Sequence, residues 1–79
     1  MSIEEFERTL KIRLQRQPFE TFVIEMLDGE QYTVTRPRAI MYPFGGESAV
    51  FFHDDGINLD FVYSDGVRHI RDCPLAASA

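Results

Sequence analysis

Residues 16–37 constrain this chain most, because they hold a proline near each end and a central Asp28-Gly29 pair. Pro18 disfavours helical geometry at the residue before it, and Pro37 interrupts strand pairing. Apolar and polar residues alternate on both sides of the Asp-Gly pair, which is typical of a β-hairpin. We therefore predict that the chain leaves a helix before Pro18 and forms two antiparallel strands within this stretch.

The length of the hairpin loop decides which side chains share a face of the sheet, because a shift of one residue moves every side chain to the other face. A two-residue Asp28-Gly29 turn would place the apolar residues of one strand opposite polar residues of the other. A three-residue loop over residues 27–29, with Gly29 left-handed in a G1 bulge, places apolar residues opposite one another. We predict this loop and the pairs that follow from it: Met26 with Glu30, Ile24 with Tyr32, and Phe22 with Val34.

The residues before Pro18 predict an amphipathic helix. Ser2 and Glu5 have the spacing of a capping box at its start. Apolar residues then recur at helical spacing and build one face: Ile3, Phe6, Leu10 and Leu14. We expect this helix to end between residues 15 and 17.

A second hairpin is predicted from residues 48–53 and 57–63, around a turn at Asp54-Asp55-Gly56. With Gly56 left-handed, the same criterion of shared faces predicts two apolar pairs: Phe51 with Leu59 and Ala49 with Phe61. Val50 and Phe52 then lie on the other face. The remaining segments are a helical turn or strand start at residues 39–42, a loop at residues 43–46, and a short last strand at residues 67–71.

The order of these elements predicts an α+β fold. The 79 residues are enough for one domain, which we place at residues 1–75 with a flexible tail at residues 76–79. An apolar content of 44% is too high for a disordered chain. We expect an N-terminal helix followed by a strongly bent antiparallel sheet of about five strands, with an SH3-like or Sm-like small barrel as the most specific interpretation.

Composition also limits the function classes. The net charge of −5 disfavours nucleic-acid binding, which usually depends on neutralising phosphates with Lys and Arg. No secretory signal and no apolar run of membrane-spanning length is present, and one cysteine cannot form an internal disulfide. We therefore expect a cytoplasmic protein without a membrane partner, a metal or another cofactor.

Several residues of the first hairpin and its flanks carry a resemblance: Arg16, Pro18-Phe19, Phe22, Asp28-Gly29, Val34 and Pro37. They resemble a family of small uncharacterised bacterial proteins that have an N-terminal helix and a segment of the form RxxPFxPFxIxxxDGxxxxVxHP. Thr21 stands where that segment has its second proline, and Arg36 stands where it has histidine. The family has no assigned activity, so the resemblance implies a fold and no chemistry. Sm-like RNA-binding proteins are a looser comparison, since this chain lacks their usual glycine in the second strand and a basic uridine-binding segment.

Two groups of chemically reactive side chains stand out: His53-Asp54-Asp55 in the second turn, and His69, Asp72 and Cys73 near the C-terminus. The first group contains ligand types suitable for a metal, but adjacent residues on a turn rarely converge. The second contains a Cys-His pair, but it is interpreted as a surface histidine and a half-buried thiol. No phosphate-binding loop or nucleophile elbow is present, and we predict that the protein is not an enzyme.

Two candidate interaction surfaces remain. Apolar residues that the predicted strands and loops direct outward favour a protein interface: Val23, Leu27, Phe44, Val50 and Phe52. Phe44 has an alternative role as a loop residue that closes the end of a barrel. Basic residues near the helix end and the hairpin exit define an arginine patch: Lys11, Arg13, Arg16, Arg36 and Arg38. Our leading hypothesis is a non-enzymatic protein-interaction or self-associating module, and the alternative is a nucleic-acid-binding small barrel that uses the arginine patch.

Overall fold

A computed structural model of the chain describes residues 1–41, 47–53 and 55–72. The predicted loop at residues 43–46 and the predicted tail at residues 76–79 lie outside these ranges. The elements are, in order, α1 (Ile3–Leu14), β1 (Phe22–Met26), β2 (Gln31–Val34), the 3-10 helix η1 (Pro37–Ala39), β3 (Ile40–Met41), β4 (Ser48–Phe52), β5 (Leu59–Tyr63), the 3-10 helix η2 (Ser64–Gly66) and β6 (Val67–Asp72).

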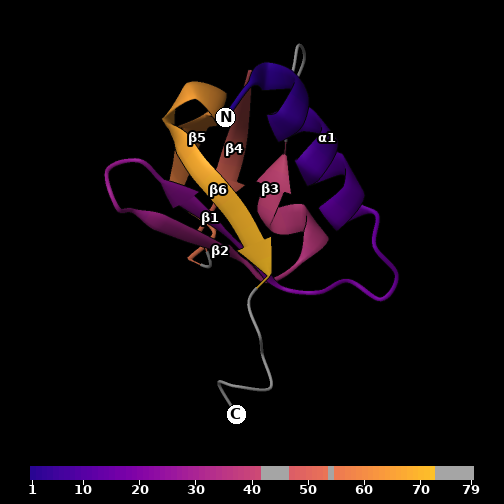
Figure 1. Ribbon diagram of the computed structural model, residues 1–79. Coiled ribbons are helices and arrows are strands. Elements are labelled where there is room, and N and C mark those ends of the chain that lie inside the picture. Colours follow the sequence, from indigo (N-terminus) through magenta and orange to yellow (C-terminus); the bar gives the residue numbers. More distant parts are fainter. Residues whose placement is uncertain (42–46, 54, 73–79) are drawn as a thin grey trace.

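The strands form two antiparallel sheets of three strands each (Figure 1). The first sheet has the order β2-β1-β6 and the second has the order β3-β4-β5. The predicted α+β class is confirmed. The architecture differs in detail from the prediction of about five strands in one bent sheet, because the described residues contain six strands in two sheets and no closed barrel.

Helix α1 begins at the predicted cap and lies along β6. The Ser2 hydroxyl accepts a hydrogen bond from the backbone N–H of Glu5 at 3.1 Å. At the start of β6, the N-terminal ammonium group donates to the carbonyl of Val67 at 3.1 Å, and further along Arg13 pairs with Asp72. These contacts attach both ends of the helix to the same strand.

The β1–β2 hairpin has the predicted register. Its cross-strand pairs include Phe22 with Val34 and Ile24 with Tyr32. Gly29 has a φ of +96°, the left-handed conformation that the three-residue loop requires. The predicted loop is therefore confirmed.

The β4–β5 hairpin differs from the predicted register by one residue. Phe51 lies opposite Asp60 and Val50 lies opposite Phe61. The loop is longer than predicted, because the backbone N–H of His53 donates to the carbonyl of Asn58 and makes these two residues the last bonded pair. As a result Val62 is buried and Phe61 is exposed, whereas the sequence predicted Leu59 and Phe61 in the core.

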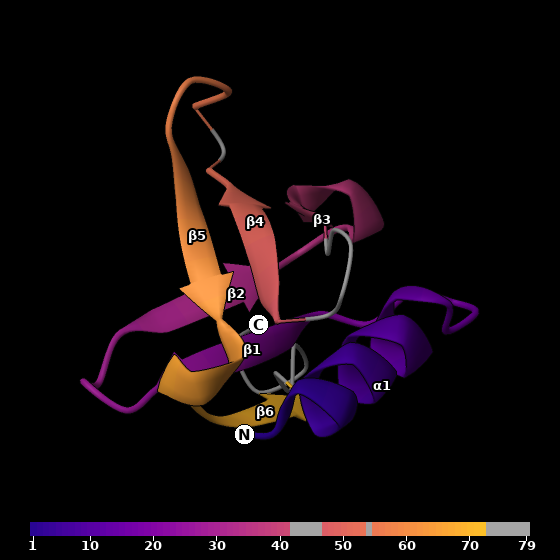
Figure 2. The same ribbon diagram turned by 90° about the horizontal axis from the view of Figure 1, so that it is seen from above.

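The core lies between the two sheets and α1. Its largest fully buried side chains come from the helix and from both sheets: Phe6, Leu10, Phe22, Ile24, Val34, Val62 and Val67. The β4–β5 hairpin projects away from the first sheet (Figure 2). This arrangement leaves two surfaces beyond the core, one on the outer face of the second sheet and one where the two sheets diverge.

Candidate functional site

The outer face of the second sheet carries a continuous set of apolar side chains. Cross-strand pairing places Met41, Val50 and Phe61 side by side across β3, β4 and β5, and it places Phe52 beside Leu59. We call the set the outer apolar face: Met41, Val50, Phe52, Leu59, Phe61 and Tyr63. Its four members outside β4 are 46–59% exposed, so α1 does not cover them.

A hollow of about 380 Å³ lies next to one end of this face. Tyr63 lines it from β5, and Met1 and Ile3 line it from the start of α1. Its lining is mixed, because polar residues also contribute to it: Ser2, Glu47, Ser64 and Asp65. The hollow thus lies between the outer apolar face and the start of the helix and offers space for a side chain.

The predicted interface residues have different environments. Val50 and Phe52 are half-buried members of the outer apolar face, and their role in an interface stays a prediction. Leu27 is 57% exposed, but it lies in the β1–β2 loop of the other sheet. Val23 is only 4% exposed, so the prediction that it contributes to an exposed surface is wrong. Phe44 lies outside the described residues.

The burial of Val23 has a structural reason. Its strand, β1, is the central strand of the first sheet and has neighbours on both sides. Thr33 of β2 and Arg71 of β6 lie directly opposite Val23. Thr33 and Arg71 thus share the face of Val23 on both sides, and the aliphatic stem of an arginine at such a position is suited to covering apolar surface.

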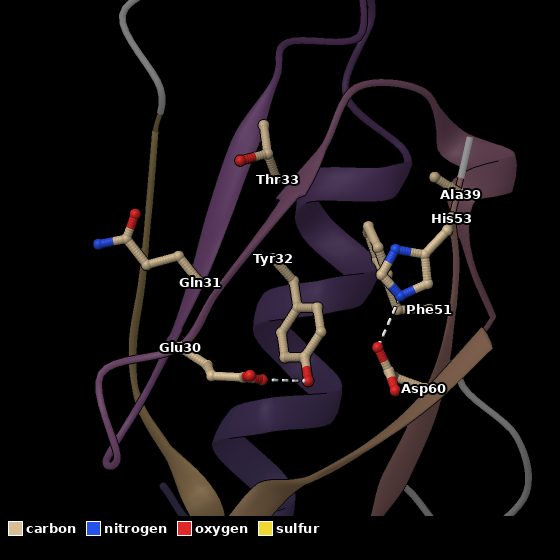
Figure 3. Close-up of a pocket in the computed structure, with 8 residues that line it drawn as sticks. All are labelled: Glu30, Gln31, Tyr32, Thr33, Ala39, Phe51, His53 and Asp60. Carbon is tan, nitrogen blue, oxygen red and sulfur yellow. Dashed lines mark hydrogen bonds and ion pairs between the residues drawn. The ribbon is translucent and has the colours of Figure 1, made fainter. Parts of the chain in front are cut away.

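A second candidate site lies where the two sheets diverge. We call this cavity of about 370 Å³ the intersheet pocket, and Figure 3 shows the side chains around it. Its lining residues come from β2, β4 and β5 and from the segments beside them: Glu30, Gln31, Tyr32, Thr33, Ala39, Phe51, His53 and Asp60. The Tyr32 hydroxyl donates to a Glu30 carboxylate oxygen at 2.9 Å, and His53 Nε2 lies 2.6 Å from an Asp60 carboxylate oxygen.

The intersheet pocket has a negative electrostatic environment. Burial, the hydrogen bond to Glu30 and the charges of Asp60, Glu30 and Asp28 together raise the pKa of Tyr32 to about 12. Each of these causes disfavours a phenolate, because desolvation and nearby carboxylates both oppose a new negative charge. The same field attracts a positive charge.

The arginine patch is partly neutralised by acidic residues. Arg13 and Arg16 both pair with Asp72, and Arg16 lies 3.6 Å from Glu20. Desolvation raises the pKa of Asp72, but the charges and hydrogen bonds of the two arginines outweigh it, and the net pKa is lowered. Arg13 and Arg16 are therefore engaged with acidic residues of the protein itself.

The other three members of the patch lie on exposed surface. Lys11 lines a shallow depression that also includes Glu4 and Glu7. Arg36 and Arg38 flank the first position of η1. Acidic neighbours around Lys11 and Arg16 give this region a mixed charge, which is less suited to a polyanion than the sequence pattern alone indicated.

The members of the two reactive groups that lie within the described ranges do not assemble into sites. His53 contacts Asp60, whereas the Asp55 carboxylate accepts the backbone N–H groups of Ile57 and Asn58 within the turn. Across the described ranges, no group of three His, Cys, Asp or Glu side chains could hold a metal ion. Asp54 and Cys73 lie outside the described residues.

The C-terminal histidine lies in a separate ion-pair network. His69 is 3.4 Å from Glu25 on β1, while Asp72 faces Arg13 and Arg16. Glu25 also lies within 3.7 Å of Arg68 and Arg71. His69 and Asp72 therefore have separate partners, and this part of β6 has charged neighbours that the sequence did not indicate.

Sequence reasoning missed the intersheet pocket. One signal was present, since Glu30 and Tyr32 are two residues apart and side chains at that spacing share a face of a strand. The other half, Asp60 with His53, depends on the register of β4 and β5, which the sequence did not predict correctly.

No family model, curated protein or solved structure matches this chain. No helix in the described part of the chain is long and apolar enough to cross a membrane.

Proposed function

We propose that this protein is a non-enzymatic interaction module that self-associates through its outer apolar face. The exposure of Met41, Leu59, Phe61 and Tyr63 on one side of a small sheet is the observation that carries this proposal. A contiguous exposed apolar surface of this kind is typical of an interaction site. The aromatic and methionine side chains on this face are also types that are enriched at interfaces.

The size of the face supports a reversible contact between two copies. A large side chain buries about 150–250 Å² when fully enclosed, so four side chains exposed by about half present roughly 400 Å². A symmetric dimer would bury this area twice, about 800 Å², and a polar rim would bring the total to about 1,000–1,200 Å². That total lies at the lower limit for specific complexes, which favours a weak dimer.

A second copy is the partner that fits this face best. A two-fold contact needs only one self-complementary surface, and two sheets pack readily face to face about 10 Å apart. The hollow beside Tyr63 and Ile3 offers each copy a place for a protruding side chain of the other. Aromatic side chains that become enclosed at the centre of an interface usually supply most of the binding energy.

Sedimentation velocity over a concentration series tests the proposal. We expect the wild type to show a sedimentation coefficient that increases with concentration between about 5 and 500 µM, as a weak dimer requires. Phe61→Thr removes the most exposed aromatic side chain of the face and should shift the series to monomer. Ile12→Thr is the matched control, because Ile12 is 57% exposed on α1, outside the second sheet, and should leave association unchanged.

Two results would refute self-association by this face. One is a monomer at every concentration of the wild type. The other is equal dimerisation of the wild type and Phe61→Thr. Loss of association in both variants would indicate a general effect of surface apolarity and would also contradict the assignment to the second sheet.

We also propose that the two-sheet arrangement is an open relative of the SH3-like or Sm-like small barrels, and that the chain is akin to the small bacterial proteins that its first hairpin resembles. Two short antiparallel sheets around one core, with a helix on one side, support the comparison. Long-range NMR contacts between backbone protons of β2 and β5 would support barrel-like closure. Their absence would favour two separate sheets.

A further inference from the structure

We infer that the intersheet pocket is a binding site for a guanidinium group, presented by an arginine side chain of a peptide or protein partner. The site is distinct from the outer apolar face and does not depend on self-association. Three rings and two carboxylates surround one cavity, and Figure 3 shows Tyr32, His53 and Asp60 directed toward the same space. This combination is suited to an organic cation, because aromatic faces and carboxylates both attract positive charge.

The rings form angled walls. The ring centroids of Tyr32 and Phe51 are 5.1 Å apart with an interplanar angle of 53°. Those of Phe51 and His53 are also 5.1 Å apart, at 88°. Phe51 is largely buried and fixes the other two rings, which remain accessible. A flat cation that enters between them can lie within about 6 Å of a ring centroid, the distance at which cation–π attraction is effective.

The carboxylates supply the hydrogen-bond acceptors. Tyr32 occupies one oxygen of Glu30, and His53 occupies one oxygen of Asp60. The contacts with Tyr32 and His53 hold the two carboxylates in place before a ligand binds. Each carboxylate has a second oxygen that can accept a hydrogen bond from the ligand. Glu30 and Asp60 are the formally charged lining residues at neutral pH, and the lining contains no Lys or Arg.

Guanidinium fits this site better than a compact ammonium group. Its planar fork of N–H donors matches carboxylates in two-point contacts, and its flat faces stack on aromatic rings. The cavity volume of about 370 Å³ is within the range of small-ligand sites and accommodates a side-chain head group. A lysine ammonium group would gain the charge attraction without the planar contacts.

NMR titration with capped amino acids tests this assignment. We expect Nα-acetyl-arginine amide to cause saturable shifts at Tyr32, Phe51, His53 and Asp60, with a dissociation constant in the millimolar range, as a single head group provides. Nα-acetyl-lysine amide should bind several-fold more weakly. Nα-acetyl-citrulline amide has nearly the same shape without the charge and should cause no saturable shift.

Variants of Glu30 and Asp60 test whether binding of the arginine probe depends on these two carboxylates. Asp60→Asn and Glu30→Gln keep the shape of the pocket and should each weaken binding of the arginine probe about tenfold, in line with the loss of one charge-assisted hydrogen bond. Asp65→Asn is the matched control, because Asp65 is an exposed acid that lines the hollow beside Tyr63. It removes the same net charge and should leave the affinity unchanged.

The assignment would be overturned by any of three results. The first is no saturable shift with the arginine probe up to about 50 mM, roughly fifty times a millimolar dissociation constant. The second is an equal shift with the citrulline probe. The third is an equal loss of affinity for the arginine probe in Glu30→Gln, Asp60→Asn and Asp65→Asn. Thermal unfolding of each variant, followed by circular dichroism, verifies that a lost signal comes from a folded protein.

Discussion

Neighbouring residues Phe61 and Val62 on β5 should respond oppositely to substitution, because they lie on opposite faces of the second sheet. Val62 is fully buried and belongs to the core, whereas Phe61 is 59% exposed. Val62→Ala removes two methyl-sized groups and should lower the free energy of unfolding by about 1.5–2.5 kcal/mol, from lost burial and the cavity left behind. Phe61→Thr keeps strong strand propensity on an exposed position and should cost less than about 1 kcal/mol.

The sizes of the two losses in the free energy of unfolding distinguish the observed register of β4 and β5 from a register shifted by one residue. If β4 and β5 were shifted by one residue, Phe61 would lie in the core and Val62 outside it. Truncation of a core phenylalanine typically costs about 3–5 kcal/mol, a large part of the stability of a domain of this size, which is about 4–12 kcal/mol. The order of the two effects would then be reversed.

Urea denaturation followed by circular dichroism measures both effects. The experiment should use a protein concentration below the onset of association, so that dimer dissociation does not add to the free energy of unfolding. A midpoint that decreases strongly for Val62→Ala and little for Phe61→Thr, with unchanged slopes, is the expected result. A larger decrease for Phe61→Thr would refute the register and, with it, the outer apolar face.

Three further predictions concern single groups. Because the pKa of Tyr32 is raised to about 12 from an unfolded value near 10, the folded state holds its proton to higher pH, and stability should fall as pH rises between these values. Ultraviolet titration should show a late-ionising tyrosine signal that Tyr32→Phe removes, and persistence of that signal in the variant would contradict the assignment. The pKa of Asp72 is lowered in the folded state, so the unfolded chain binds more protons in acid, and stability should decrease as pH falls below about 4. Asp72→Asn should make the melting temperature depend less on pH in this range. Gly29→Ala should lower the free energy of unfolding by about 1–2 kcal/mol from the positive φ alone, since no atom lies within 4 Å of the added Cβ, and an unchanged denaturation midpoint would contradict the G1 loop.

The two hairpins show what the sequence could and could not predict. In the first, the apolar residues on both strands agree with only one loop length, so the criterion of shared faces was sufficient. In the second, apolar residues are adjacent on both strands, so a shift of one residue still leaves three apolar pairs: Ala49 with Val62, Val50 with Phe61, and Phe52 with Leu59. In the observed turn the Asp55 carboxylate accepts two backbone N–H groups, and these bonds favour the longer loop. Side-chain contacts with the backbone in a turn of this kind compete with the strand ladder and are difficult to weigh from sequence.

The sequence pattern could not predict features that depend on contacts between distant segments of the chain. Val23 was expected to be exposed from alternation, but β1 became the central strand, and Arg71, 48 positions later in the chain, lies opposite it. The intersheet pocket is a similar case, because Glu30 directly precedes β2 of the first sheet and Asp60 lies on β5 of the second. Secondary structure follows local rules, whereas such neighbours depend on how the sheets pack together.

The β4–β5 hairpin supplies residues to both proposed binding surfaces, and its register assigns each residue to one of them. Val50 and Phe61 form one cross-strand pair on the outer apolar face, and the next pair, Phe51 with Asp60, faces inward toward the pocket. Because successive side chains point to opposite faces of a strand, a partner on one surface does not block the other. Phe61→Thr should therefore abolish self-association and leave binding of the arginine probe intact. Asp60→Asn should weaken binding of the arginine probe about tenfold and leave self-association intact. Loss of both activities in either variant would mean that the two surfaces act as one site.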